Sequence, residues 1–272
     1  MTGGLDLHAL EQGLAGSELS FHLRHFAQAG STQDLVLRAA AAGTPEGLTV
    51  FAEEQLLGRG RSGRSWDAPA GSALLFSLLL RPPGPPAGWG ALSLVAAVAV
   101  AEGVEGAGGP PVEIKWPNDC LSRGRKLAGI LSESSAAPPS SPRLVLGVGC
   151  NVAWGGMSLP EEVRAAGTAC DLEGHPVERT VLARELLLSL DRRYREWRTA
   201  GFGAAREAWL GRAPDLGREV LLQLQQRTIS GRALGVSLEG ELILATASGE
   251  IRVGTGEVVV GPRPLPPSPE DL

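Results

Sequence analysis

The 272-residue chain is poor in cysteine, aromatic residues and lysine. Its three cysteines are too few for a disulfide framework and lack the paired spacing of a zinc site. Aromatic residues make up only 4%, which argues against an extended surface for stacking nucleic-acid bases. The net charge of −5 excludes a broad basic footprint for nucleic acid. Of the 25 Lys and Arg residues only two are lysines, so these two positions stand out.

Long hydrophobic runs and targeting signals are also scarce. The longest apolar stretch, residues 91–101, is shorter than the roughly 20 residues that span a bilayer. The first residues include Asp6, His8 and Glu11 and carry no cationic apolar run typical of a secretion signal. We therefore expect a soluble, cytoplasmic protein without a membrane partner. Its length allows one large domain and a small one.

Both lysines, Lys115 and Lys126, lie in one segment, residues 115–133. Arginine presents a planar, permanently charged fork, whereas lysine presents a compact charge that can reach a single oxygen. Two lysines kept together in an arginine-rich chain favour a chemical role. The alternative is that a GC-rich genome has replaced lysine by arginine almost everywhere and left these two by chance.

A glycine- and arginine-rich loop precedes them, Gly58-Arg59-Gly60-Arg61-Ser62-Gly63-Arg64-Ser65-Trp66. Glycine lets a backbone approach a ligand closely, and guanidinium groups bind phosphate. The pattern differs from a P-loop, since no Gly-Lys-Ser or Gly-Lys-Thr occurs, and residues 147–151 lack the third glycine of a dinucleotide fingerprint. Apolar segments on both sides favour an embedded functional loop over a flexible RNA-binding tail.

The hydrophobic pattern predicts an α+β protein with few helices between its strands. Residues 1–213 are predicted to form the larger domain, residues 214–263 a small β-barrel and residues 264–272 a tail. We expect a surface turn at 136–142. The predicted helices are 19–27, a helix that Ser31 or Thr32 caps, 91–105 and 177–210. The predicted strands are 48–52, 73–80, 112–116, 128–133 and 144–148, then 219–224, 227–236, 241–245, 250–253 and 257–260.

Taken in order, these motifs resemble those of the biotin protein ligases, which attach biotin to a lysine of carboxylase carrier domains. The resemblance covers about residues 30–261. It rests on Gly30-Ser31-Thr32, Glu54-Gln55 with the loop 58–66, Lys115-Trp116-Pro117-Asn118-Asp119, Arg125-Lys126-Leu127-Ala128-Gly129-Ile130-Leu131, Gly147-Val148-Gly149-Cys150-Asn151-Val152 and Gly256-Glu257-Val258. It implies a mixed-sheet catalytic domain of the biotin/lipoate ligase type, an SH3-like C-terminal barrel, and homodimerisation as a family trait.

The implied reaction joins the biotin carboxylate to the α-phosphate of ATP, releases pyrophosphate, and transfers biotin to the acceptor lysine. The implied substrates are biotin and ATP with Mg²⁺, and the implied partner is the biotin carboxyl carrier domain of acetyl-CoA carboxylase or a related carboxylase. Both steps concentrate negative charge, which preorganised cations and backbone donors stabilise.

The resemblance also assigns residues. The implied catalytic residues are Lys126, Arg61 and Asp119, with Asp119 as the Mg²⁺ ligand. The implied biotin-binding residues are Ser31, Thr32, Gln55, Gly58, Arg59, Gly60, Arg61, Lys126, Gly129, Leu131 and Gly147. Those implied for ATP and the adenylate are Arg59, Arg61, Arg64, Trp66, Asn118, Lys126 and Asn151. Other readings stay open: Ser31 as a bare helix cap, Asp119 as a turn residue, and Trp66 as a core aromatic.

Two segments depart from the family pattern. Only 30 residues precede Ser31, too few for a helix-turn-helix domain, so we expect a ligase without repressor function and without a nucleic-acid partner. Residues 153–158 match the family loosely, which leaves the adenine contact unassigned. The nearest alternative is a lipoate-type ligase, and a more remote one is a nucleic-acid-binding module, whose binding would weaken steeply with salt.

Overall fold

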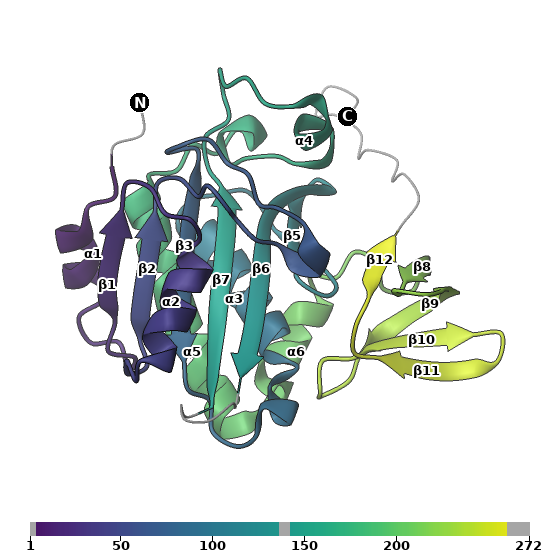
Figure 1. Cartoon of the computed structure of the whole chain (residues 1–272). Coiled ribbons are helices and arrows are strands. Elements are labelled where there is room, and N and C mark those ends of the chain that lie inside the picture. The colour runs from purple at the N-terminus through teal and green to yellow at the C-terminus, as the bar shows by residue number, and fades with distance from the viewer. Residues whose placement is uncertain (1–3, 136–141, 260–272) are drawn as a thin grey trace.

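A computed structural model describes residues 4–135 and 142–259 (Figure 1). The predicted tail and nearly all of the predicted turn at 136–142 lie outside the described residues. The chain forms one large mixed sheet with helices and a second, smaller antiparallel sheet. The predicted α+β class is therefore confirmed.

The larger sheet has the strand order β1-β2-β3-β7-β6-β5-β4. Strands β1 and β2 run parallel, and every other neighbouring pair is antiparallel. The strands are β1 His22–Phe26, β2 Leu48–Ala52, β3 Ala73–Leu80, β4 Glu113–Lys115, β5 Asp119–Ser122, β6 Arg125–Ser135 and β7 Arg143–Asn151. Strands β2 and β3 are buried along their whole length, which explains their largely apolar sequences.

Helices cover both faces of this sheet (Figure 1). Helix α2 packs on one face, and α3 and α5 pack on the other. The helices are α1 Leu7–Gly13, α2 Thr32–Ala41, α3 Leu92–Gly106, α4 Glu161–Ala166, α5 Arg179–Ala200 and α6 Gly203–Leu210, and the 3-10 turns are η1 Arg61–Gly63, η2 Pro86–Trp89 and η3 Asp171–Glu173. Beside α2, this arrangement leaves the middle of β3, β7 and β6 to carry functional groups.

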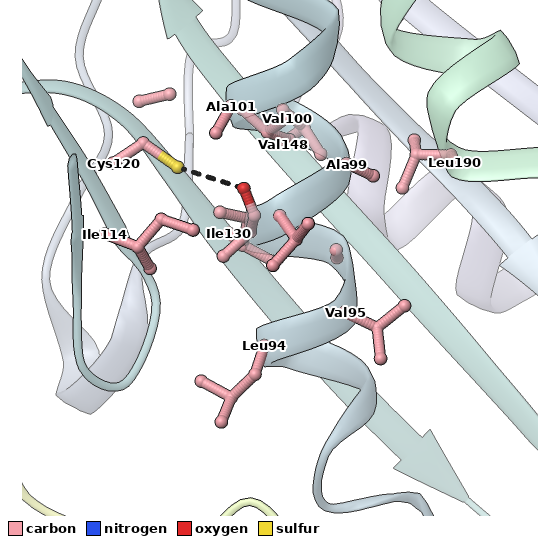
Figure 2. Close-up of a cluster of buried hydrophobic side chains, with 14 of the residues drawn as sticks. Leu94, Val95, Ala99, Val100, Ala101, Ile114, Cys120, Ile130, Val148 and Leu190 are labelled. Atoms are coloured by element: carbon pink, nitrogen blue, oxygen red, sulfur yellow. Dashed lines mark hydrogen bonds between the residues drawn. The ribbon is translucent and has the colours of Figure 1, made fainter. Parts of the chain in front are cut away.

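Helix α3 is the central core helix, and its side chains meet Ile114, Ile130 and Val148 of the sheet (Figure 2). By length and composition the segment Pro86–Gly106 could cross a membrane, with a mean hydropathy of 1.6. However, 72% of its most apolar window is buried inside the protein. The segment is therefore apolar because it packs in the core of the protein.

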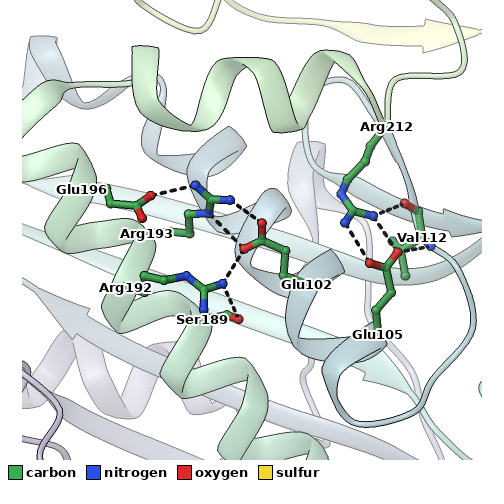
Figure 3. A network of polar contacts seen from close by, with 8 residues as sticks. All are labelled: Glu102, Glu105, Val112, Ser189, Arg192, Arg193, Glu196 and Arg212. Atoms are coloured by element: carbon green, nitrogen blue, oxygen red, sulfur yellow. Dashed lines mark hydrogen bonds and ion pairs between the residues drawn. The ribbon is translucent and has the colours of Figure 1, made fainter.

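Charged residues join α3 to its neighbours (Figure 3). Glu102 accepts hydrogen bonds from Arg192 and Arg193 of α5, and Glu105 is paired with Arg212 at 2.6 Å. Burial alone would raise the pKa of the Glu102 carboxyl, but the hydrogen bonds from the two arginines outweigh it and lower the pKa. This network fixes α5 against α3 on the side of the sheet opposite α2.

The three cysteines are free and fully buried. Cys120 lies beside α3, and its thiol donates to the carbonyl of Ala97 at 3.7 Å (Figure 2). Burial raises the pKa of the Cys120 thiol, and a hydrogen bond with Cys170 together with burial raises the pKa of Cys150. Thiols that solvent cannot reach are poor nucleophiles, so the three cysteines act as core side chains.

Five predictions of local structure were wrong or incomplete. Residues 19–27 contain strand β1 instead of a helix, because the segment pairs in parallel with β2 at the sheet edge. Helix α1, capped by the Asp6 side chain, helix α4 and strand β5 were not predicted. The helix predicted at 177–210 is two helices, since Gly201 adopts a φ of 66° between α5 and α6.

The smaller sheet follows α6 and has the order β11-β10-β9-β8-β12. Its strands are β8 Glu219–Gln223, β9 Thr228–Val236, β10 Leu242–Thr246, β11 Gly249–Val253 and β12 Glu257–Val259. The indole N–H of Trp116 donates to the carbonyl of Gly240 at 3.1 Å, and Arg206 donates to the carbonyl of Val236 at 2.9 Å. These bonds join the small sheet to the larger unit close to the lysine motif.

Candidate active site

A pocket lies between the start of α2, strands β3, β7 and β6, and the loop 58–66. It brings together Ser31, Thr32, Gln55, Arg59, Gly60, Arg61, Trp66, Asn118, Lys126, Gly129, Leu131 and Gly147, all named from the sequence. It adds six residues that sequence reasoning missed: Gln33, Phe76, Ser77, Ile130, Val148 and Gly149. We call this the first cavity.

One part of the first cavity is lined by polar side chains that contact one another in a row: Gln33, Ser77, Thr32 and Gln55. Gln33 donates to the carbonyl of Val145 at 3.1 Å, so its Oε1 must accept. Ser77 Oγ contacts that oxygen at 3.0 Å and Thr32 Oγ1 at 2.9 Å. Thr32 Oγ1 in turn contacts Gln55 Oε1 at 3.0 Å, which also accepts from the Thr32 amide at 2.7 Å.

This chain has more acceptors than donors. Its three oxygen-to-oxygen contacts share only the two hydroxyl hydrogens of Ser77 and Thr32. Beside it, the Ser31 hydroxyl is buried and has no hydrogen-bond partner among the described residues. Ser31 sits at the N-cap of α2 without making a side-chain capping bond. The cavity therefore offers unused accepting capacity next to one unused hydroxyl donor.

The loop 58–66 folds back on itself across the cavity. The Trp66 amide donates to the carbonyl of Gly58 at 3.0 Å, and the Gly60 amide donates to that of Arg64 at 2.7 Å. A Cβ at Gly58 would lie 2.1 Å from the Trp66 carbonyl oxygen, so only glycine fits there. The fold-back directs Arg61 and Trp66 toward the lysine motif.

The Trp66 ring rests on two glycines that pair across β6 and β7. A Cβ at Gly149 would lie 2.5 Å from the ring, and one at Gly129 would lie 2.9 Å from it. Lys126 Nζ is 5.4 Å from the ring centroid, which places the ammonium over the indole. The glycines thus create the space in which Trp66 packs beside Lys126.

Three cations of the loop and of the lysine motif are matched by carboxylates. Arg59 lies 2.9 Å from Asp34 and 2.8 Å from Glu133. Lys126 Nζ lies 2.7 Å from Asp119 Oδ1, and Arg64 binds both oxygens of Glu257 in β12. These pairings hold the loop to α2, to β6 and to the small sheet.

Arg61 differs from them. Its guanidinium donates to Asn118 Oδ1 at 3.2 Å, and no carboxylate of the described residues lies within ion-pair distance of it. Burial lowers the pKa of Arg61, the charges of Asp119 and Glu257 oppose this, and the charge of Arg64 adds a smaller lowering. An arginine nevertheless stays protonated in proteins. Arg61 is therefore a half-buried cation available to an anionic ligand.

A second cavity lies on the other side of Trp66 and Lys126. Arg64 and Asn151 line part of this cavity. Another part is lined by the segment of residues 152–173, which we call the flap and which contributes Trp154, Val163, Gly167 and other residues. Asn151 donates to the carbonyls of Lys126 at 3.4 Å and Thr168 at 2.9 Å. Because both cavities share Lys126 and Trp66, ligands in them would meet at the Lys126 ammonium.

The Mg²⁺ assignment rests on Asp119 alone. Within residues 4–135 and 142–259 no cluster of three or more Asp, Glu, His or Cys side chains could hold a metal. Asp119 and Asn118 border a space that also contains Lys126 and Arg61. A single carboxylate fits Mg²⁺, which commonly takes most of its other ligands from substrate phosphates and water.

The contact between Arg64 and Glu257 leads to a pH prediction. Hydrogen bonds from Arg64 lower the pKa of the Glu257 carboxyl, so its stabilisation is full at neutral pH and is lost as the pH falls through the lowered folded-state pKa. We expect Glu257→Gln to cost below about 1 kcal/mol at pH 7, since both side chains are partly exposed. Urea unfolding should show this difference shrinking in acid. A difference that grows in acid would contradict the pairing.

Comparisons with known proteins agree with these features. Residues 26–151 match the Biotin/lipoate A/B protein ligase family, and residues 215–261 match the Biotin protein ligase C terminal domain. The chain is 37% identical over 263 residues to a biotin--[acetyl-CoA-carboxylase] ligase of Mycobacterium tuberculosis, covering 94% of this chain and 95% of that one. It is 33% identical over 260 residues to the bifunctional ligase/repressor BirA of Bacillus subtilis, covering 95% and 80%.

A solved structure, the biotin protein ligase from Aquifex aeolicus in complex with biotin and ATP, superposes with a TM-score of 0.74 at 27% identity. The match covers 88% of this chain and 97% of that one. The C-terminal match separates this chain from lipoate ligases, which the first family description also includes. On its two family matches and its identity to full-length relatives, the chain belongs to the biotin protein ligase family.

Proposed function

We propose that this chain is an ATP-dependent biotin protein ligase that forms biotinyl-5'-AMP and then biotinylates a lysine of a carboxylase carrier domain. The observation that carries the proposal is the buried Ser31 hydroxyl without a partner, beside an acceptor-rich chain of side chains. The head group of biotin is a cyclic urea with one carbonyl and two N–H groups. Ser31 can donate to that carbonyl, and the acceptors around Thr32 can take the N–H groups.

Lipoate would leave this end of the first cavity unmatched. Its dithiolane ring has no N–H donor and no carbonyl acceptor, so it could satisfy neither Ser31 nor the oxygens around Thr32. A buried polar group left without a partner costs about 1–3 kcal/mol. The cavity therefore supports biotin over lipoate by the same rule through which polar sites reject analogues that lack a hydrogen-bonding group.

The proposed chemistry takes place where the two cavities meet. A carboxylate oxygen of biotin attacks the α-phosphorus of ATP, and the bond from that phosphorus to the pyrophosphate oxygen breaks. Lys126 and Arg61 stabilise the negative charge that gathers on the carboxylate and phosphate oxygens. Asp119 orients the Lys126 ammonium from 2.7 Å away. Bound Mg²⁺, with Asp119 as its protein ligand, would neutralise further phosphate charge.

In the second step the amine of the acceptor lysine attacks the acyl carbon of the anhydride. The bond from the acyl carbon to the phosphate oxygen breaks, AMP leaves with the electron pair, and the amine loses a proton. Arg61 and Lys126 face the departing phosphate as they face the incoming one, so one pair of cations serves both steps.

An ATP–pyrophosphate exchange assay tests the proposal. With Mg²⁺ present, exchange should depend on biotin and should be absent with lipoate or without an acid. Exchange with lipoate alone would assign the chain to the lipoate-type ligases. If neither acid supports exchange, the chain does not adenylate biotin or lipoate and the proposal is wrong.

Replacement of Ser31 tests the urea contact. We expect Ser31→Ala to weaken biotin binding roughly tenfold or more, because the biotin carbonyl would lose its buried donor. Titration calorimetry with biotin measures this change. Ser17→Ala is a matched control, since Ser17 also has a buried hydroxyl without a partner but lines neither cavity. Equal affinities of the Ser31 variant and the wild type would contradict the contact.

We propose that the carrier domain docks beside the C-terminal half of β6. Strand β5 pairs with β6 up to Gly129, and Asn118 hydrogen-bonds the amide and carbonyl of Ile130. Beyond Ile130, Ser132 and Ser134 border a groove that continues to Arg61 and the small sheet. An extended segment of the carrier could pair with this edge and present its lysine near Arg61. Homodimerisation stays a proposal from the family resemblance, for sedimentation to test.

The remaining assignments are proposals of the same kind. We place the division between the catalytic part and the small sheet near residue 214, and we expect activity in the cytoplasm, where carboxylases and ATP are available. A nucleic-acid or membrane partner is not expected. The net charge is −5, and Arg59 and Arg64 already contact carboxylates.

A further inference from the structure

Glu173 is a buried carboxylate that the proposed chemistry does not use. Its side chain is only 1% exposed. One oxygen accepts from the Thr168 hydroxyl at 2.6 Å and from Arg125 at 2.7 Å. The other lies 3.4 Å from Arg123 Nε. A buried charge is costly unless it is paired. Here Oε1 is hydrogen-bonded, whereas Oε2 meets Arg123 as an ion pair and has no hydrogen-bond partner among the described residues.

The partners of Glu173 belong to two segments that meet at Lys126. Arg123 and Arg125 flank the tight turn between β5 and β6, where Arg123 adopts a φ of 48°, and Lys126 follows directly. On the other side, the Thr168 amide donates to the Lys126 carbonyl at 2.8 Å. The carboxylate of Glu173 thus links Arg125, which precedes Lys126 in the chain, to Thr168, which donates to the Lys126 carbonyl.

The same contacts anchor the flap, which forms one wall of the second cavity. Thr168 and Glu173 lie in its C-terminal part, and Gly167, which bridges to Lys126, lines the cavity itself. The rest of the flap is held by Asp171, which accepts from the amides of Trp154 at 3.0 Å and Gly155 at 2.7 Å. Asp171 therefore organises the flap internally, whereas Glu173 attaches it to the sheet.

We propose that Glu173 is a positioning residue that holds the flap against β6 and keeps Lys126 beside the bound nucleotide. This inference rests on the proposed function in assigning ATP to the second cavity. Without the carboxylate, Arg123, Arg125 and Thr168 lose their common acceptor. The flap then opens more often, ATP and the adenylate bind less tightly, and the biotin end of the first cavity, which Glu173 does not touch, keeps its affinity.

Glu173→Gln tests this role with little change in shape. We expect the KM for ATP in pyrophosphate exchange to rise roughly tenfold, as the loss of a charge-assisted contact predicts, while the Kd for biotin changes less than about twofold. Hydrogen exchange at the amides of residues 163–170 should become faster in the ligand-free protein. Thr168→Val, which removes one of the contacts, should give a smaller change of the same kind.

Glu102→Gln is the matched control. Glu102 is also a partly buried carboxylate held by two arginines, but it lines neither cavity. Its loss should lower the unfolding midpoint and leave the KM for ATP unchanged. An unchanged KM and unchanged exchange at 163–170 in both Glu173→Gln and Thr168→Val would overturn the inference. If the wild type showed no biotin-dependent exchange, the proposed function would fail separately, and the amide exchange rates would still decide whether Glu173 holds the flap.

Discussion

Lys126→Ala is expected to lower biotin-dependent pyrophosphate exchange by roughly 10²- to 10³-fold, the usual loss on removing one preorganised donor from a site of developing charge. Lys126 is shared by both cavities, so it can reach the biotin carboxylate and the α-phosphate together. The substitution has a second effect, because it leaves the Asp119 carboxylate without the cation 2.7 Å away, close to where phosphate would lie. Like charges at that distance repel, which should weaken ATP binding as well.

Two further variants separate these effects. Lys126→Ala combined with Asp119→Asn removes the unpaired carboxylate and also the proposed Mg²⁺ ligand, so we expect ATP affinity to recover when it is measured without Mg²⁺, whereas the rate of exchange with Mg²⁺ should not recover. Lys126→Arg restores the charge but places a planar fork in the space between Asp119 and the Trp66 ring, so recovery should be partial. Lys126→Ala with near wild-type exchange and an unchanged circular dichroism spectrum would exclude Lys126 from the chemistry.

Arg61→Ala is expected to release biotinyl-adenylate instead of holding it for transfer. Among the cations that line the first cavity, Arg61 is the one that contacts no carboxylate of the described residues, so its charge is available to the anhydride phosphate. One charged hydrogen bond contributes about 1.5–3 kcal/mol, a factor of roughly 10–100 in affinity. Free adenylate would then label lysines of a bystander protein such as albumin, measurable by blotting for biotin.

Arg59→Ala provides the comparison for Arg61→Ala, since Arg59 belongs to the same loop but already binds Asp34 and Glu133. Its loss should loosen the loop and raise the Kd for biotin without broadening the labelling pattern. Bystander labelling equal to the wild type in the Arg61 variant, with full activity on the carrier, would show that Arg61 does not retain the intermediate.

Much of the sheet can be predicted from the sequence because burial on both faces leaves a simple pattern. Strands β2 and β3 are apolar except for Thr49 and Ser77, and α3 is a long stretch of mostly small and branched apolar residues. Strand β1 gives no such signal, because it lies at the edge of the sheet and is only half buried. Its parallel pairing with β2 depends on a contact that no local pattern encodes.

In the site as well, some residues can be identified from the local sequence and others only from the fold. Residues in compact motifs, such as Lys126 and Arg61, can be named from the sequence and lie together in the structure. Ser77 is a polar residue within a strand of apolar ones, a signal that could have identified it. Glu133 and Glu257, which bind the loop arginines, lie far along the chain. Charge matching over such separations follows only from the fold.

The complete burial of Cys120, Cys150 and Cys170 has a practical consequence. Thiol reagents react with thiolates that solvent can reach, so the folded chain should stay unlabelled until it opens. Cys120 and Cys150 lie in β5 and β7, so the rate at which they become reactive reports unfolding of the larger sheet, without any engineered probe. A single cysteine introduced on the flap would be the one reactive thiol of the folded protein, and a fluorophore there could follow nucleotide binding directly.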